Sequence, residues 1–180
     1  MTEKNTMWNS AARSGLVLGC ISIVCLMANN FLAKPAGSTG AAVVTGVAST
    51  LLWIAKIAVC IILMRRFILS FASETGATRS EARSFGRKTA LLSALLYSGF
   101  YLAYVLYINP DIFTDALSSV AESGMIPSDQ MDLAESMKGK MPRYTFICNL
   151  IYCYLFGAVL SLIFSSGVSD NPFDQEKQDQ

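Results

Sequence analysis

The chain has no histidine and little charge. Among its 180 residues, 14 Lys and Arg and 13 Asp and Glu make up 15% of the total, against about 25% in an ordinary soluble domain. The lack of histidine removes the most common general base and metal ligand. A net charge of +1 gives no basic face for nucleic acid. We therefore expect neither an ordinary soluble enzyme nor a nucleic-acid-binding protein.

The few charges leave four long apolar stretches between them. The charge-free stretches are each at least 20 residues long and lie at 14–33, 35–55, 89–110 and 144–169. About 20 helical residues, at 1.5 Å each, cross the roughly 30 Å hydrocarbon core of a bilayer. The sequence therefore predicts an all-α membrane protein whose single domain, residues 15–166, contains four transmembrane helices. We place these helices at 15–31, 43–64, 89–108 and 144–166.

Basic residues are concentrated on one side of the predicted membrane. Nine lie in the N-terminal tail 1–14, the loop 65–88 and the C-terminal tail 167–180, whereas four lie on the other side. By the positive-inside rule, both tails are cytoplasmic, and the polar composition of the second tail predicts disorder. The basic residues of the loop 65–88 form either a site for anionic lipid head groups or simply the positively charged flank that keeps the end of a span in the cytoplasm.

Both longer loops carry helix signals. In the cytoplasmic loop, Thr78 and Glu81 form a capping-box pattern, which predicts a helix that continues into the third span. The outer loop, residues 109–143, begins with Asn109 and Pro110 and predicts an amphipathic helical hairpin. Its apolar face consists of Ile112, Phe113, Leu117, Val120, Met131, Ala134, Met137 and Met141. This face either covers the bundle and the lipid interface or forms a methionine-rich groove for a partner.

Lys56 is the one charge that lies inside a predicted span. It precedes Arg65 by nine residues, roughly 13 Å from the cytoplasmic edge, where inserting a lysine costs about 2.5 to 3.5 kcal/mol. Ser49, Trp53 and Cys60 share its helix face, so a cation–π contact with Trp53 is sterically allowed. Two interpretations stay open. Lys56 snorkels or makes an interhelical hydrogen bond, or it binds an anionic ligand or lines an ion path.

Hydroxyl groups are the polar groups that the other spans offer at the depth of Lys56. They belong to Ser22, Tyr97, Ser98, Tyr101, Tyr154 and Ser161. The third span also presents an aromatic stripe at helical spacing, which consists of Tyr97, Phe100, Tyr101, Tyr104 and Tyr107. The stripe is either a packing surface or a binding surface, and its hydroxyls are candidates for hydrogen bonds to Asn29, Asn30 or Asn149.

Two pairs of small residues predict close contacts between helices. Gly15 and Gly19 form a Gly-x3-Gly pair in the first span, and Ala42 and Gly46 form a small-x3-small pair in the second. Such pairs allow two helix backbones to approach closely within a membrane.

Three passages resemble the bacterial domain-of-unknown-function 4199 family, small four-span membrane proteins without an assigned activity. They are Ser-Phe-Gly at 84–86, Asn-Pro-Asp at 109–111, and the hairpin segment 122–131 with the downstream Met137 and Met141. The resemblance extends from about Arg13 to Ser166, and it implies the same topology and a location in the inner membrane of a Gram-negative cell. At 77–80 the chain reads Ala-Thr-Arg-Ser, where relatives tend to have a Gly-Gly-aromatic turn.

The chain lacks the side chains and motifs that usually carry out enzyme catalysis. There is no histidine, no acidic residue inside the predicted spans and no phosphate-binding glycine loop. The five cysteines all lie in the apolar stretches, where we expect free thiols rather than disulfides or a zinc site. We therefore expect no catalytic residue, no metal and no cofactor.

Two functions from different classes remain. The preferred one is a non-enzymatic membrane subunit or scaffold that binds another envelope protein. The alternative is a small homo-oligomeric transporter or lipid-handling protein that contacts an anionic substrate. Its candidate contact residues are Lys56, Trp53, Ser49, Tyr97, Tyr101 and Tyr104.

Overall fold

The computed structural model describes residues 2–32, 39–122, 136 and 138–169. Within these residues the chain is helical and contains no strand. The four long helices are α1 (Thr2–Leu32), α2 (Thr39–Thr75), α3 (Arg79–Ala103) and α6 (Met141–Ser165). The segments long and apolar enough to cross a membrane are Thr6–Leu32, Val43–Thr75, Arg79–Ile108 and Lys138–Ser165. The prediction of an all-α protein with four helices of transmembrane length is confirmed.

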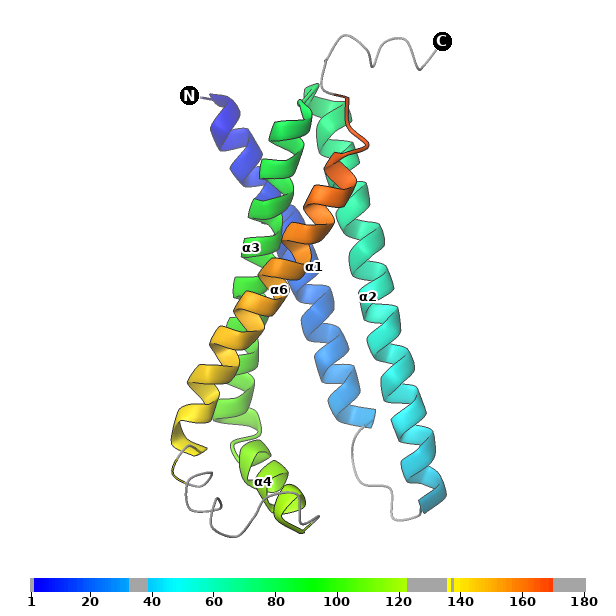
Figure 1. Ribbon diagram of the computed structural model, residues 1–180, viewed down its shortest axis with the longest axis vertical. Coiled ribbons are helices and arrows are strands. Elements are labelled where there is room, and N and C mark those ends of the chain that lie inside the picture. Colours follow the sequence, from blue (N-terminus) through cyan, green and yellow to red (C-terminus); the bar gives the residue numbers. More distant parts are fainter. Residues whose placement is uncertain (1, 33–38, 123–135, 137, 170–180) are drawn as a thin grey trace.

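The long helices alternate in direction, so the start of α1 and the end of α6 lie at the same end of the molecule (Figure 1). We call this the terminal end, and it also holds the turn between α2 and α3. The opposite end, which we call the loop end, carries α4 (Ile112–Glu122). Toward the loop end, α3 and α6 diverge from α2 (Figure 1). α2 therefore lies close to α3 and α6 at the terminal end and apart from them at the loop end (Figure 1).

Glycines allow α1 to approach α3 closely. A Cβ atom added at Gly15 would lie 2.9 Å from Leu92 Cβ, and one added at Gly19 would lie 3.1 Å from Leu96 Cβ. Both distances are shorter than ordinary contact, so a larger residue at either position would require the neighbouring leucine or the helices to shift. The prediction from this Gly-x3-Gly pair is confirmed. For the second pair, a Cβ added at Gly46 would meet no atom of the described residues within 4 Å, so Gly46 makes no close contact within this part of the chain.

The contact between α3 and α6 depends on a second set of small residues. A Cβ atom added at Gly86 would lie 2.8 Å from Ser161 Cβ, and one added at Gly157 would clash with Ala90. The buried Ser161 hydroxyl donates a hydrogen bond of 2.9 Å to the Arg83 carbonyl oxygen. Close packing of backbones and interhelical hydrogen bonds both stabilise the association of helices in lipid.

The terminal end holds the best-packed apolar core. The rings of Phe71 on α2 and Phe85 on α3 stack with centroids 4.2 Å apart and an interplanar angle of 3°. Met64 and Ile68 on α2 are almost completely buried beside them. Because these residues pack against α3, α2 continues past Arg65 to Thr75 instead of ending at residue 64, where the run of apolar residues stops.

The turn between α2 and α3 follows the predicted helix signals. Gly76 has φ +61°, the left-handed conformation that glycine adopts most readily at a helix end. Thr78 is the N-cap of α3, and its backbone N–H donates to Glu81 Oε2 at 2.9 Å. The capping box is therefore confirmed, and α3 runs without a break from this turn into the third span.

The outer loop is described only in part. After Pro110, α4 forms as an amphipathic helix that has Asp115 in its first turn, where an acidic side chain stabilises the helix dipole. Near the fourth span, Lys138–Lys140 form a 3-10 turn that leads into α6. The second half of the predicted hairpin, at 123–135 and 137, and the end of the C-terminal tail, at 170–180, lie outside the described residues.

Substitution of Gly19 tests the contact between α1 and α3. We expect Gly19→Leu to lower the free energy of unfolding by about 1 to 3 kcal/mol, the usual effect of overpacking, because the new side chain would collide with Leu96. Gly46→Leu is the matched control, since a Cβ there meets no atom of the described residues, and we expect no loss of stability but a gain of roughly 0.5 to 1 kcal/mol from replacing a glycine within a helix. Denaturation of the purified protein in mixed micelles measures both. Equal losses in the two variants would contradict this packing.

Candidate ligand-binding site

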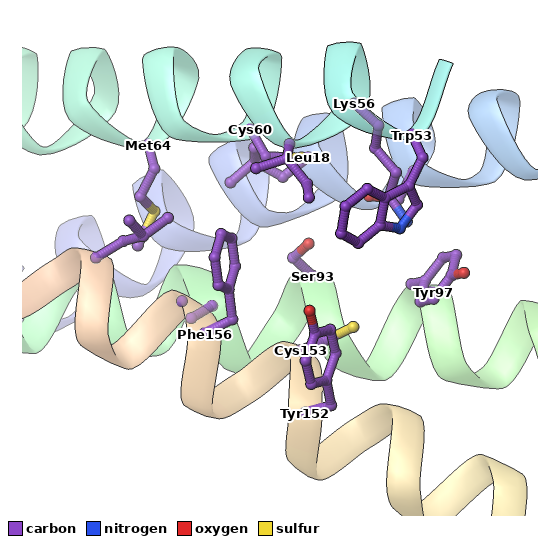
Figure 2. Close-up of a pocket in the computed structure, with 15 residues that line it drawn as sticks. Leu18, Trp53, Lys56, Cys60, Met64, Ser93, Tyr97, Tyr152, Cys153 and Phe156 are labelled. Atoms are coloured by element: carbon purple, nitrogen blue, oxygen red, sulfur yellow. The ribbon is translucent and has the colours of Figure 1, made fainter. Parts of the chain in front are cut away.

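A pocket of about 110 Å³ lies where the helices begin to diverge, and all four long helices line it. It is elongated along the bundle (Figure 2). At the end nearer the termini, it is lined by apolar side chains, including Met64, Phe156 and Leu160. At the other end lie the polar side chains of Lys56 and Tyr97 together with Trp53 (Figure 2). The pocket is therefore amphipathic along its length.

Lys56 reaches across the pocket from α2 to α3. Its ammonium nitrogen lies 4.3 Å from the centroid of the Tyr97 ring, which is within the range of a cation–π contact. The predicted ring partner, Trp53, lines the same pocket but is 57% exposed. The long lysine side chain thus finds its aromatic partner on the neighbouring helix rather than on its own. The structure places the half-buried Lys56 side chain in the pocket that all four long helices line.

The positive charge of Lys56 has no acidic counterpart in the membrane. No Asp or Glu occurs in the four apolar stretches of the sequence, and the acids of the described helices lie near helix ends, as Glu74, Glu81 and Asp115 illustrate. A cation–π contact contributes about 2 kcal/mol or somewhat more in a desolvated site. It therefore offsets only part of the cost of removing an ammonium group from water. An anion in the pocket would stabilise the ammonium much further.

Hydroxyl and thiol groups supply the rest of the polar lining. The hydroxyls come from Ser22, Ser93, Tyr97 and Tyr152, and the thiols come from Cys60 and Cys153. All five cysteines of the chain are free. Figure 2 shows Ser93 on α3 and Tyr152 with Cys153 on α6 opposite the side chains of α2. The groups that face the ligand space are thus one cation, several neutral hydrogen-bonding groups and apolar surface.

Tyr101 and Tyr104, two further residues of the predicted aromatic stripe, follow Tyr97 from the pocket toward the loop end. The ring centroids of Tyr97 and Tyr101 are 6.4 Å apart, and those of Tyr101 and Tyr104 are 6.2 Å apart. The Tyr104 hydroxyl accepts a hydrogen bond of 3.4 Å from Asn109 Nδ2, and not from the predicted asparagines of the first and fourth spans. The structure therefore brings together Lys56 and three of the tyrosines as a connected row.

Tyr107 does not belong to this row, which corrects the predicted stripe. A π-helical turn, η1 (Tyr104–Ile108), follows α3, and the Asn109 N–H donates to the Tyr104 carbonyl oxygen at 2.9 Å. This i→i+5 pairing widens the turn and changes the direction of the side chains after Tyr104. As a result Tyr107 is 83% exposed.

The structure brings only some of the predicted polar side chains to Lys56. Ser49 is not among the side chains that line the pocket. Ser161 lies nearer the terminal end, where it bonds the Arg83 carbonyl. The α6 residues that do line the pocket include Tyr152 and Phe156, which sequence reasoning missed. Their position depends on how far α6 is rotated about its axis, and no local pattern in the sequence gives that angle.

Comparison with known proteins gives a family but no residue roles. A family model described as "Protein of unknown function (DUF4199)" matches residues 13–166, a range that takes in most of all four long helices. No curated protein and no solved structure matches the chain. The chemistry of the pocket is therefore the basis for assigning a function.

Removing the charge of Lys56 tests whether the pocket is an unfavourable place for an ammonium group. We expect Lys56→Leu to raise the free energy of unfolding by about 2 to 3 kcal/mol, close to the cost of placing a lysine in a membrane span. Ala55→Leu is the matched control, because Ala55 is the exposed neighbour on the same helix. Denaturation in mixed micelles without added ligand measures both variants. A loss of stability in Lys56→Leu alone would mean that its contacts outweigh its desolvation.

Proposed function

The chain belongs to the DUF4199 family, and because that family's description assigns no activity, we propose a function from the pocket itself. The protein is a multi-pass membrane protein that binds an anionic amphiphile inside its helix bundle. It holds this ligand without changing it chemically. The proposal therefore takes up lipid handling by Lys56 and the tyrosine row, which was the second of the two functions considered from the sequence.

The observation that carries the proposal is the position of Lys56. Its ammonium group faces the pocket against the Tyr97 ring, and the spans contain no carboxylate that would neutralise it. Buried charges in proteins are normally paired, and ionisable side chains within a membrane mark ligand or ion sites. A negatively charged group of the ligand supplies the missing partner.

The remainder of the pocket favours an amphiphile over an inorganic anion. Apolar side chains such as Leu18, Met64, Phe156 and Leu160 form much of its lining. They contribute no hydrogen bonds, but they bury an alkyl chain favourably. Binding without catalysis is supported by the remaining groups, because the pocket's hydroxyls and thiols have no histidine or carboxylate beside them to act as a general base.

The other function considered from the sequence, a subunit or scaffold for another envelope protein, stays a prediction. Its natural docking surface is the exposed apolar face of α2, which includes Val47, Leu51 and Ile54. In a membrane the same face is equally suited to lipid. The homo-oligomer expected for a transporter stays a prediction for the same reason.

We place the terminal end on the cytoplasmic side of the bacterial inner membrane. Arg13, Arg65 and Arg66 are exposed near this end, and the positive-inside rule favours the cytoplasm for such residues. The Lys88 ammonium lies 5.0 Å from the centroid of the Trp8 ring. A tryptophan beside a basic residue is typical of a helix at the boundary between lipid and water.

Cysteine labelling tests this orientation. In a variant without the native cysteines, Ser119→Cys on α4 is expected to react with a membrane-impermeant maleimide in intact spheroplasts. Ser73→Cys near the end of α2 is the matched control, since both serines are exposed, and it is expected to react only after lysis. The reverse pattern would overturn the orientation without affecting the pocket.

Protection of a native thiol tests ligand binding. Cys60 lines the pocket, whereas Cys20 is exposed on α1, next to the Gly19–Leu96 contact and therefore at a similar depth. In single-cysteine variants in liposomes, we expect a singly charged anionic amphiphile such as dodecanesulfonate to slow the reaction of Cys60 with a lipid-soluble maleimide several-fold. The reaction of Cys20 is expected to stay unchanged, and dodecanol is expected to protect neither thiol.

The same experiment contradicts the proposal if both thiols are slowed equally, because that would be a general effect of the amphiphile on the bilayer. It also contradicts the proposal if protection of Cys60 persists undiminished in the Lys56→Leu background. Protection that depends on Lys56 and is confined to Cys60 is the result that supports binding in the pocket.

A further inference from the structure

The size and charge of the pocket select one class among the anionic amphiphiles. We propose that the ligand is a long-chain monocarboxylate, that is, a fatty acid. Its carboxylate accepts a hydrogen bond from the Lys56 ammonium, and its alkyl chain leaves the bundle sideways between α2 and α6. This inference rests on the proposed function above and names the ligand of the same site.

The charge of the site matches a monoanion. Lys56 is the only charged side chain among the residues that line the pocket, and it is the only basic residue inside the four predicted spans. One carboxylate neutralises it. A phosphate monoester carries a charge of about −1.5 to −2 at neutral pH and would leave an unpaired negative charge in the membrane, which is strongly unfavourable.

The volume of the site distinguishes a carboxylate from a phospholipid head group. A cavity of about 150 Å³ holds one benzene molecule, so a pocket of about 110 Å³ encloses a group somewhat smaller than a benzene ring. A carboxylate and the first methylene groups fit within it. The phosphodiester and the glycerol unit of a glycerophospholipid together do not. The phosphodiester therefore fails on size although its single charge would suit Lys56.

The sides of the pocket define where the chain runs. Met64 is 1% exposed and Leu160 is 9% exposed, and they close the pocket toward the terminal end. Trp53 on α2 and Tyr152 on α6 are 57% and 62% exposed, and both line the pocket. Figure 2 shows these two rings reaching from their helices into the same gap. An alkyl chain that leaves between them passes directly into the hydrocarbon core of the bilayer.

The two tryptophans of the chain make this testable without adding a label to the protein. Trp53 lines the pocket, whereas Trp8 lies near the terminal end beside Lys88. A Trp8→Phe variant therefore reports fluorescence from the pocket alone, and a Trp53→Phe variant is the matched control. The full chain is placed in liposomes of phosphatidylcholine, and 9,10-dibromostearate is added, because bromine quenches indole fluorescence on contact.

We expect saturable quenching of Trp53, which excess oleate reverses and which oleyl alcohol and phosphatidylglycerol leave unchanged. Lys56→Gln is expected to weaken binding about tenfold, since a hydrogen bond to a charged group contributes on that order, while Lys56→Arg keeps most of the affinity. Trp8 in the control variant is expected to show only quenching that rises linearly with the content of brominated lipid. Circular dichroism confirms that each variant keeps its helix content.

Two other results overturn the inference in different ways. If brominated phosphatidylglycerol quenches Trp53 saturably and with dependence on Lys56, and oleate does not displace it, the fatty-acid assignment is wrong while the proposed function stands. If every brominated lipid quenches Trp53 linearly and Lys56→Gln changes nothing, the assignment and the proposed function both fail.

Discussion

The close approach of α1 and α6 to α3 is the constraint on which the rest of the structure depends. Helices in a bilayer gain little from the hydrophobic effect when they associate, so contact between backbones has to supply the stabilisation. Gly15 and Gly19 provide this contact for α1, and Gly86 and Gly157 provide it for α6. Because both neighbours are held against α3, their rotations about their own axes are fixed, and these rotations decide which side chains face the pocket.

α2 is held in the bundle differently from α1 and α6, and this difference creates the pocket. α2 joins the bundle through side chains at the terminal end, where Phe71 stacks on Phe85. Farther along, a Cβ added at Gly46 would meet no atom of the described residues within 4 Å, and α2 diverges from α3 and α6 (Figure 1). Lys56 lies between these two regions, where the space is wide enough to hold its side chain and narrow enough for its ammonium to reach Tyr97. A more tightly packed α2 would leave no room for a ligand.

Much of this architecture was predictable because it follows from local rules. The gaps between charged residues predicted the helices, and the spacing of Gly15 and Gly19 predicted a close contact between helices. Lys56 stood out because no placement of the four spans puts it at a membrane surface. The Thr78–Glu81 cap depends on neighbouring residues alone, and it too was predictable. Each of these features is determined within a few residues of the chain.

The features that sequence reasoning missed depend on distant contacts. α2 extends to Thr75 because residues far along the chain pack against it, and Arg65 and Arg66 are compatible with a helix that continues into water. The π-helical turn that directs Tyr107 outward has no evident signal among its own residues. Tyr152 faces the pocket because Gly157 meets Ala90, a contact between helices that are separated by a long loop.

The pairing of α1 with α3 also has a consequence for how the protein is made. Gly15 meets Leu92 and Gly19 meets Leu96, so these two helices are parallel, and α2 lies between them in the sequence. A nascent chain that has inserted only its first two spans contains a glycine face on α1 with nothing to receive it. Until α3 enters the bilayer, lipid covers that face. The contact between α1 and α3 therefore forms only when the third span arrives, and biosynthesis separates the insertion of α1 from its packing against α3.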